Sequence, residues 1–315
     1  MLQEIKSDPL PSWGIGVRAF IIVVALFWAT FSSAAVSEWV PFESHNGLIL
    51  MPITIYGEEA RALLDSGAAG GAVSEHFLSQ HEGKYSTGQQ ITLEGINSQR
   101  QANLINDVRL GIFGVEFELD RLYPVQIEFA DFVIGMPFFD SFILQIDYPN
   151  KRLRIIEHGS LDLKSFANVK LRRAHASPQV KVQVEFEDEY KPWLLFDTGS
   201  NGGVFLQRSK VDALGWLEKY SLVESKARGV NKTARVERFN VPLMSFGPYE
   251  LENVIVTVPA AGEATNINRI GEDWVYGSRR RGNSSDGILG YDVLKHFVVT
   301  LDLKHKLMHI EAPPP

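Results

Sequence analysis

The stretch Leu63-Leu64-Asp65-Ser66-Gly67-Ala68 is repeated later in the chain as Leu195-Phe196-Asp197-Thr198-Gly199-Ser200. Each copy holds two apolar residues, an aspartate, a small hydroxyl residue, a glycine and a second small residue. Average composition predicts a single Asp-Ser/Thr-Gly tripeptide about 0.1–0.2 times in a chain of this length. One copy would therefore carry little weight, but a duplicated copy points to one short turn used twice in one fold.

The repeat continues downstream of both copies in the same order. Phe132-Val133-Ile134-Gly135 follows the first copy, and Asp286-Gly287-Ile288-Leu289-Gly290 follows the second. From Gly135 to Ile155 and from Gly290 to Ile310 the matching positions run without a gap. We call the stretches that end in Gly135 and Gly290 the apolar-Gly segments. Between each motif and its apolar-Gly segment lies a third repeated element, Gly95-Ile96-Asn97 in the first half and Gly229-Val230-Asn231 in the second. Two halves of related fold are therefore predicted.

The repeat also sets the expected domain boundaries. We predict a first lobe over residues 39–158, a linker over 159–168 and a second lobe over 169–312. The distance from motif to apolar-Gly segment is longer in the second half, and most of the excess lies at 260–285. Insertions of this length are usually functional or disordered.

The local sequence pattern predicts an all-β fold. Residues 48–55 and 180–186 have strand-like patterning, as do 142–147 and 297–302, which are each followed by a turn and a final strand. Short helices are expected at 75–81, at 208–214 and directly after Gly135 and Gly290.

The N-terminal segment 1–35 lies outside the repeat. An apolar stretch from Ala19 to Phe31 follows Arg18 and precedes Ser32-Ser33-Ala34-Ala35, the form of a signal peptide with a small-residue cleavage site. Counting apolar residues from Gly14 to Val36 leaves an uncleaved membrane anchor open. We expect an exported protein, either periplasmic or anchored to the membrane by this segment.

Composition excludes several classes of function. The chain has no cysteine, which rules out disulfides, thiol catalysis and thiolate metal sites. Its net charge of −7 gives no indication of a nucleic-acid partner. His305 and His309 are four residues apart, but that spacing binds metal from a helix and this segment is predicted to be a strand. No metal or cofactor is expected.

Two loops that each carry the Asp-Ser/Thr-Gly motif can bring two carboxylates to one water molecule. Because two like charges in contact cannot both be ionised, one proton is shared and the pair titrates as a unit. The ionised carboxylate can then act as general base on the water while the protonated one donates to a substrate carbonyl. The Ser or Thr hydroxyl of each motif can hydrogen-bond across the interface and hold the loops in register.

This pattern resembles the retropepsin-like and pepsin-like aspartic peptidases over nearly the whole chain after residue 40. The resemblance implies an all-β fold of two pseudo-twofold-related, retropepsin-like β-barrel lobes with a cleft between them. It implies a peptide or protein as substrate, and one chain that forms its own pseudo-dimer as a monomer. The roles that it implies are a catalytic dyad of Asp65 and Asp197; support of the active-site loops by Ser66, Gly67, Thr198, Gly199 and Ser200; and flaps over the substrate at Gly95, Ile96, Asn97, Gly229, Val230 and Asn231.

The two motifs differ at their last position, Ala68 against Ser200. In the family a hydroxyl there can hydrogen-bond the catalytic carboxyl and favour its ionisation. Unequal surroundings for the two aspartates follow, with a pH optimum between mildly acidic and neutral.

The sequence also allows other interpretations of these motifs. Each Asp-Ser/Thr-Gly could be a plain structural turn, since these are good turn sequences. The second repeated pair of aspartates, Asp147 and Asp302, closes strand ends before a turn and is interpreted as structural. The chain could bind peptides without turnover, as an exported binding or sensory module. It could also be a latent peptidase gated by the 260–285 loop.

Overall fold

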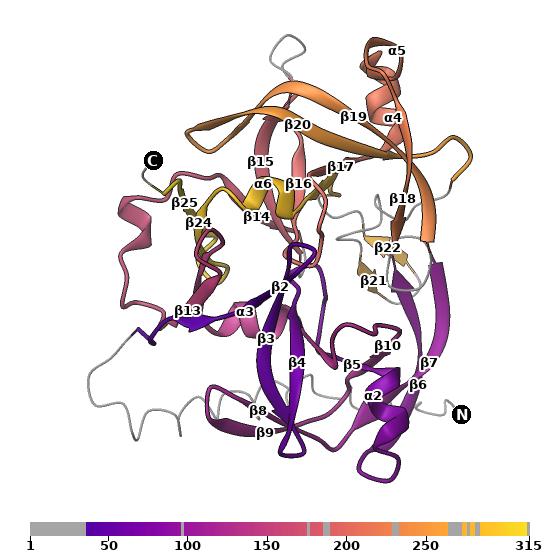
Figure 1. The fold of residues 1–315 in the computed structure, drawn as a ribbon, viewed down its shortest axis with the longest axis vertical. Coiled ribbons are helices and arrows are strands. Elements are labelled where there is room, and N and C mark those ends of the chain that lie inside the picture. Colours follow the sequence, from indigo (N-terminus) through magenta and orange to yellow (C-terminus); the bar gives the residue numbers. More distant parts are fainter. Residues whose placement is uncertain are drawn as a thin grey trace, which may run out of the picture.

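The computed structural model describes residues 36–95, 98–174, 177–184, 190–228, 233–263, 273–275, 278–280 and 284–313. The predicted leader or anchor, 1–35, lies outside these residues. The fold is built from strands with a few short helices, as the sequence pattern predicts. In Figure 1 the first half of the chain fills the lower part of the molecule and the orange strands of the second half fill the upper part.

An eight-stranded sheet forms the first lobe. Its path is β10-β5-β11-β4-β3-β8-β9, with β2 paired to β3. The central strand β11 runs parallel to β4 and antiparallel to β5. The strands are β2 (Glu43–His45), β3 (Leu48–Ile55), β4 (Glu58–Leu64), β5 (Ala72–Ser74), β8 (Val108–Ile112), β9 (Val115–Leu119), β10 (Tyr123–Val125) and β11 (Phe132–Ile134). The predicted strand at 48–55 is therefore present with the same bounds.

A second eight-stranded sheet forms the other lobe, in the order β14-β15-β16-β23-β17-β20-β19-β18. Here β23 runs parallel to β16 and antiparallel to β17, the same arrangement as β11 in the first lobe. The strands are β14 (Leu171–Ala174), β15 (Ser177–Val184), β16 (Trp193–Phe196), β17 (Val204–Leu206), β18 (Val223–Arg228), β19 (Thr233–Phe246), β20 (Tyr249–Pro259) and β23 (Gly287–Leu289).

A five-stranded sheet contains strands from both halves of the chain, in the order β1-β13-β12-β24-β25. Its strands are β1 (Val40–Pro41), β12 (Ile143–Asp147), β13 (Arg152–Ile156), β24 (Val298–Asp302) and β25 (Leu307–Glu311). The repeat-related strands β12 and β24 pair directly, Leu144 opposite Leu301 and Ile146 opposite Val299. All four side chains are buried, and burying such a side chain contributes about 1.5–3 kcal/mol. This sheet joins the two lobes.

The helices are short and lie near their expected positions. The sequence predicts helices at 75–81 and 208–214, and the structure has α2 (Glu75–Gln80) and α4 (Arg208–Ala213). The two helices expected after the apolar-Gly segments are α3 (Met136–Ser141) and α6 (Tyr291–Leu294). The described part of the chain also has α5 (Trp216–Lys219) and the 3-10 turn η1 (Leu163–Ser165), which lies in the predicted linker. In the described part of the chain, no helix combines the length and apolar character that a membrane span requires.

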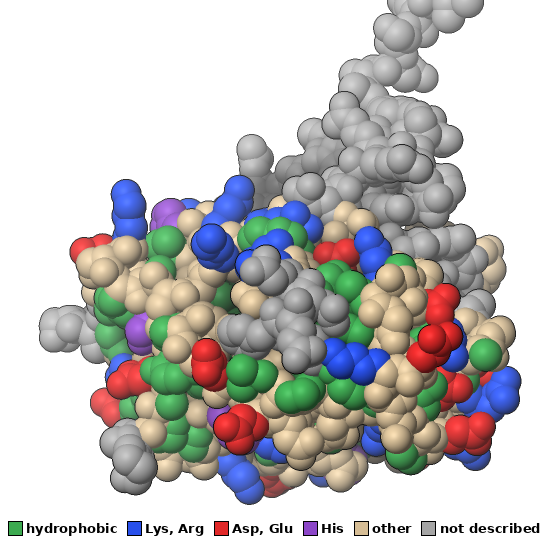
Figure 2. Space-filling view, turned by 90° about the horizontal axis from the view of Figure 1, so that it is seen from above, with side chains coloured by type: hydrophobic (Ala, Val, Ile, Leu, Met, Phe, Trp, Pro, Cys, Tyr) green, Lys and Arg blue, Asp and Glu red, His purple; other side chains and the backbone are tan. Residues whose placement is uncertain are grey.

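Two features extend from the sheets. The hairpin of β6 (Ser86–Gly95) and β7 (Ser98–Asn106) forms a two-stranded sheet of its own. Within the predicted insertion at 260–285, β21 (Asp273–Val275) pairs with β22 (Ser278–Arg280). On the face shown in Figure 2, acidic, basic and apolar side chains are interspersed.

Candidate active site

Each motif aspartate directly follows a buried strand. Leu64 is the last residue of β4 and Phe196 the last of β16, and both are fully buried. The amide of Asp65 donates to the carbonyl of Ile134 at 3.0 Å, and the amide of Asp197 donates to Leu289 at 3.0 Å. The apolar residues before each aspartate therefore anchor it, because they hold the strand inside the core beside a parallel neighbour.

The two loops are joined by four hydrogen bonds through Ser66 and Thr198. The Ser66 amide donates to Thr198 Oγ1 and the Thr198 amide donates to Ser66 Oγ, both at 3.0 Å. Each hydroxyl in turn donates to the strand of the other lobe, Ser66 Oγ to the Phe196 carbonyl at 2.7 Å and Thr198 Oγ1 to the Leu64 carbonyl at 2.8 Å. Both side chains are buried, so these bonds are shielded from water.

The glycine of each motif lies against the carboxylate of the other motif. A Cβ on Gly67 would lie 2.8 Å from Asp197 Oδ1, and a Cβ on Gly199 would lie 2.5 Å from Asp65 Oδ1. Neither position has room for a side chain. Each carboxylate therefore lies against the loop of the other motif, and the structure brings the two aspartates together.

The pKa values of both carboxyls are raised, and that of Asp197 is raised the more. Burial is the main cause for each, and the charge of Asp65 adds to it at Asp197. Backbone amides oppose the rise at both carboxyls: Asp65 Oδ1 accepts the amides of Gly67 at 2.8 Å and Ala68 at 3.1 Å, and the Gly199 and Gly67 amides act on Asp197. Asp197 Oδ1 accepts the Gly199 amide at 2.9 Å. The two buried carboxyls therefore titrate as a pair that shares one proton.

The apolar-Gly segments pass directly beneath the loops. The Met136 amide donates to the Ala68 carbonyl and the Tyr291 amide to the Ser200 carbonyl, both at 2.9 Å. A Cβ on Gly135 would lie 2.8 Å from the Ala68 oxygen, and one on Gly290 would lie 2.6 Å from the Ser200 oxygen. Only glycine fits at these two positions.

The predicted flap residues are flanked by paired strands. Gly95 ends β6 and pairs with Ser98, and Arg228 of β18 pairs with Thr233 of β19. Ile96 and Asn97 lie between the first pair and Gly229, Val230 and Asn231 between the second; these five lie outside the described residues.

Comparison with known proteins agrees with this geometry. The model of a family described as "Aspartyl protease" matches residues 182–293, a segment that contains Asp197. Among solved structures, the aspartic proteinase from Irpex lacteus superposes with a TM-score of 0.53 at 8% identity, over 88% of this chain and 97% of that one. This chain has the fold of the pepsin- and retropepsin-like aspartic peptidases. No protein in a search of curated sequences matches the chain.

The aspartic peptidase fold places the Ser200 hydroxyl differently from the family expectation. Its Oγ lies 2.7 Å from the position of a Cβ on Gly290, beneath the loop. Among the described residues it makes no hydrogen bond to the Asp197 carboxyl. The Ser200 hydroxyl therefore does not contribute to the difference between the two aspartates, and the charge of Asp65 acts on Asp197 in addition to burial.

Two tyrosines near the dyad could not be identified from the motifs. The buried hydroxyl of Tyr148 forms no hydrogen bond within the described part of the chain, and burial followed by the charge of Asp197 raises its pKa. The Tyr291 ring lies 6.2 Å from the Tyr148 ring, measured between centroids, and covers Gly47. Tyr148 follows the repeated aspartate Asp147, where the second half has Leu303, so the repeat gives no signal for it.

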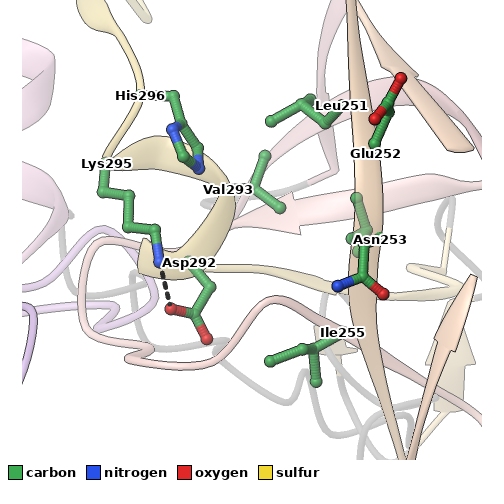
Figure 3. A pocket seen from close by; sticks show the side chains of 9 residues that line it. Leu251, Glu252, Asn253, Ile255, Asp292, Val293, Lys295 and His296 are labelled. Carbon is green, nitrogen blue, oxygen red and sulfur yellow. Dashed lines mark hydrogen bonds and ion pairs between the residues drawn. The ribbon is translucent and has the colours of Figure 1, made fainter. Parts of the chain in front are cut away.

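A small pocket lies between β20 and α6 (Figure 3). Two of its charged groups pair with each other, since Lys295 Nζ lies 3.0 Å from Asp292 Oδ1. Burial, and then the charge of Lys295, lowers the pKa of His296. None of the predicted site residues lines this pocket, so it is separate from the dyad.

Proposed function

We propose that this protein is an aspartic endopeptidase, which hydrolyses peptide bonds with a water molecule activated between Asp65 and Asp197. The reciprocal packing of the two motifs carries the proposal. Each carboxylate lies against the glycine of the other loop, and the Ser66–Thr198 hydrogen bonds fix the two loops to each other. The family match and the shared fold support the same class of activity.

In this proposal the two aspartates have different roles. Asp65, which accepts two amide hydrogen bonds, is the general base that takes a proton from the water. Asp197, with the more strongly raised pKa, holds the proton and donates it to the carbonyl oxygen of the scissile bond. The water attacks the carbonyl carbon directly, without a covalent enzyme intermediate.

The proposed enzyme works as a monomer. Both carboxylates come from one chain, and β12 and β24 already join the two lobes in one sheet. A second copy is therefore not needed to complete the dyad.

Incubation of the full chain with a diverse peptide library, from pH 3 to pH 8, tests the proposal. Mass spectrometry would detect new termini and would show which residues flank the cleaved bond. Saturable binding of peptides with no products at any pH would contradict peptidase activity and favour a binding module. Cleavage that appears only when the β21–β22 segment is deleted would instead identify a latent peptidase.

We also propose that the protein is exported and works in the periplasm or at the membrane surface. The apolar stretch Ala19–Phe31 after Arg18, with Ser32-Ser33-Ala34-Ala35 behind it, supports this location. N-terminal sequencing of protein recovered from cell fractions would separate a cleaved leader from a retained anchor.

A further inference from the structure

Three residues that play no part in the dyad form a polar cluster beside the sheet that joins the lobes. Asp302 ends β24 and is buried, with 2% of its surface exposed. His158 follows β13 and His305 lies in the turn after β24. His305 Nδ1 lies 2.8 Å from Asp302 Oδ2, and His158 Nδ1 lies 3.3 Å from Asp302 Oδ1.

The first half of the repeat shows what this position contains when it is purely structural. Asp147 is the counterpart of Asp302 and is also buried. Arg152 Nε lies 2.8 Å from Asp147 Oδ2, and Asn150 donates to the same carboxylate through its backbone and side-chain nitrogens. Asp147 is thus neutralised by a permanent cation, and its pKa is lowered despite the opposing effect of burial.

The second half of the repeat lacks the arginine that neutralises Asp147 in the first half. By the gapless alignment of the repeat, His305 stands where the first half has Asn150, and Leu307 stands where it has Arg152. The turn itself is unchanged, because the His305 amide donates to Asp302 Oδ1 at 3.1 Å just as the Asn150 amide donates to Asp147 Oδ1. A buried carboxylate therefore faces two imidazoles in place of a guanidinium and an amide.

The hydrogen bonds of His158 fix which of its nitrogens carries a proton. Its Nε2 lies 3.2 Å from the carbonyl oxygen of Asp140, which can only accept, so Nε2 carries the proton. In the neutral ring Nδ1 then has a lone pair. This buried nitrogen forms no hydrogen bond and points toward the Asp302 carboxylate. Two electron-rich atoms that face each other at this distance repel unless a proton or a metal ion lies between them.

We propose that His158, Asp302 and His305 bind a divalent transition-metal ion, with Zn²⁺ as the best match. Two imidazoles and one carboxylate form a donor set typical of such ions. A carbonyl that accepts from the second ring nitrogen, as Asp140 does for His158, is the usual partner of a metal-binding histidine. The donor atoms all lie within 4.8 Å of one another. The His305 side chain is 51% exposed, so it can turn inward to close the site and leave a position open to water.

Metal binding at this cluster would fasten the two lobes together. His158 follows β13 and Asp302 ends β24, and both strands pair with β12 from opposite sides. An ion held by both would cross-link β13 and β24 across β12, which lies between them in the joining sheet. Because the metal binds only the folded arrangement, it would stabilise the protein by mass action.

His305 and His309 are four residues apart in sequence, but in the structure their side chains have different partners. His309 Nδ1 lies 2.8 Å from the Phe166 carbonyl, while His305 turns to Asp302. His309 is therefore a suitable control, because it is a nearby histidine outside the cluster.

Calorimetric titration of the full chain, free of any affinity tag, with ZnCl₂ at pH 7.5 tests the proposal. We expect one site per chain, a rise in melting temperature with Zn²⁺ and visible absorption bands when Co²⁺ replaces it. His305→Asn, which copies the first half, and His158→Gln should each weaken binding at least about tenfold. His309→Gln should leave binding unchanged.

Mg²⁺ in place of Zn²⁺ should give no comparable binding. Failure of the wild-type chain to bind Zn²⁺, or equal affinity in His305→Asn and the wild type, would overturn the proposal. His305→Asn retains the backbone hydrogen bond to Asp302, so it decides the matter even if His158→Gln does not fold. None of these measurements depends on peptidase activity.

Discussion

Ser66 and Thr198 hold each other in a reciprocal arrangement, in which the backbone amide of each donates to the side-chain hydroxyl of the other at 3.0 Å. The two residues are 132 positions apart and belong to different lobes. Because each hydroxyl also donates to a carbonyl of the opposite strand, neither loop can shift without breaking bonds to the other. The relative position of the two carboxylates is therefore set by these four hydrogen bonds between the loops.

Removing one hydroxyl should destabilise the protein and misalign the dyad. Thr198→Val keeps the side-chain shape but leaves the Ser66 amide and the Leu64 carbonyl without their partner. We expect a loss of about 1–3 kcal/mol in the free energy of unfolding, measured by denaturant titration. Thr198→Ser keeps the hydroxyl and should retain most activity; equal loss in both variants would show that the hydroxyl is not the cause.

Adding a methyl group to the second motif glycine should disable the site. A Cβ on Gly199 would collide with the Asp65 carboxyl. We expect Gly199→Ala to lower kcat/KM by about a hundredfold or more, since displacement of a catalytic group by 1 Å can cost that much. Gly202, three residues on, faces open space with no positive φ, so Gly202→Ala is the matched control. Similar activity in the two variants would contradict the observed packing.

Replacing Asp197 by asparagine should stabilise the protein at neutral pH. Burial, then the charge of Asp65, raises the pKa of Asp197 in the folded state, so the folded chain keeps a proton that the unfolded chain releases. Stability from this group is complete below the unfolded pKa of 3.8 and is lost as the pH rises through the folded value. Asparagine cannot ionise and avoids this loss.

Melting temperatures of Asp197→Asn and the wild type would be compared from pH 3.5 to pH 7.5. We expect little difference at the acidic end and an advantage for the variant on the order of a few °C at pH 7.5. A variant less stable than the wild type at pH 7.5 would argue against a strained carboxyl pair.

The rate of peptide hydrolysis should depend on pH in a bell-shaped manner. The active form carries one proton on the dyad, so kcat/KM falls when a second proton binds and again when the first is lost. Because burial raises the pKa of both carboxyls, the maximum should lie between mildly acidic and neutral pH. A sharp maximum below about pH 3, near the range of the most acidic dyads, would contradict this assignment.

The features that could be predicted from sequence are those that the repeat duplicates. Both motifs, the glycines beneath them and the helices that follow are encoded locally. The strand pair β12–β24 and the carbonyl partners of Ser66 and Thr198 lie far apart in sequence, so no local pattern reveals them. Differences between the halves are harder to interpret from sequence. The replacement of Asn150 by His305 indicates a metal site only when the structure places His158 beside Asp302.

The most direct test of the account uses the best substrate found in the peptide library. Asp65→Asn and Asp197→Asn each remove one carboxyl while keeping its size, and each should lower kcat/KM by at least about a thousandfold, in the range expected for loss of an acid–base group. Circular dichroism would show that both variants are folded. If either variant cleaved the substrate at a rate close to that of the wild type, the proposed dyad would be wrong.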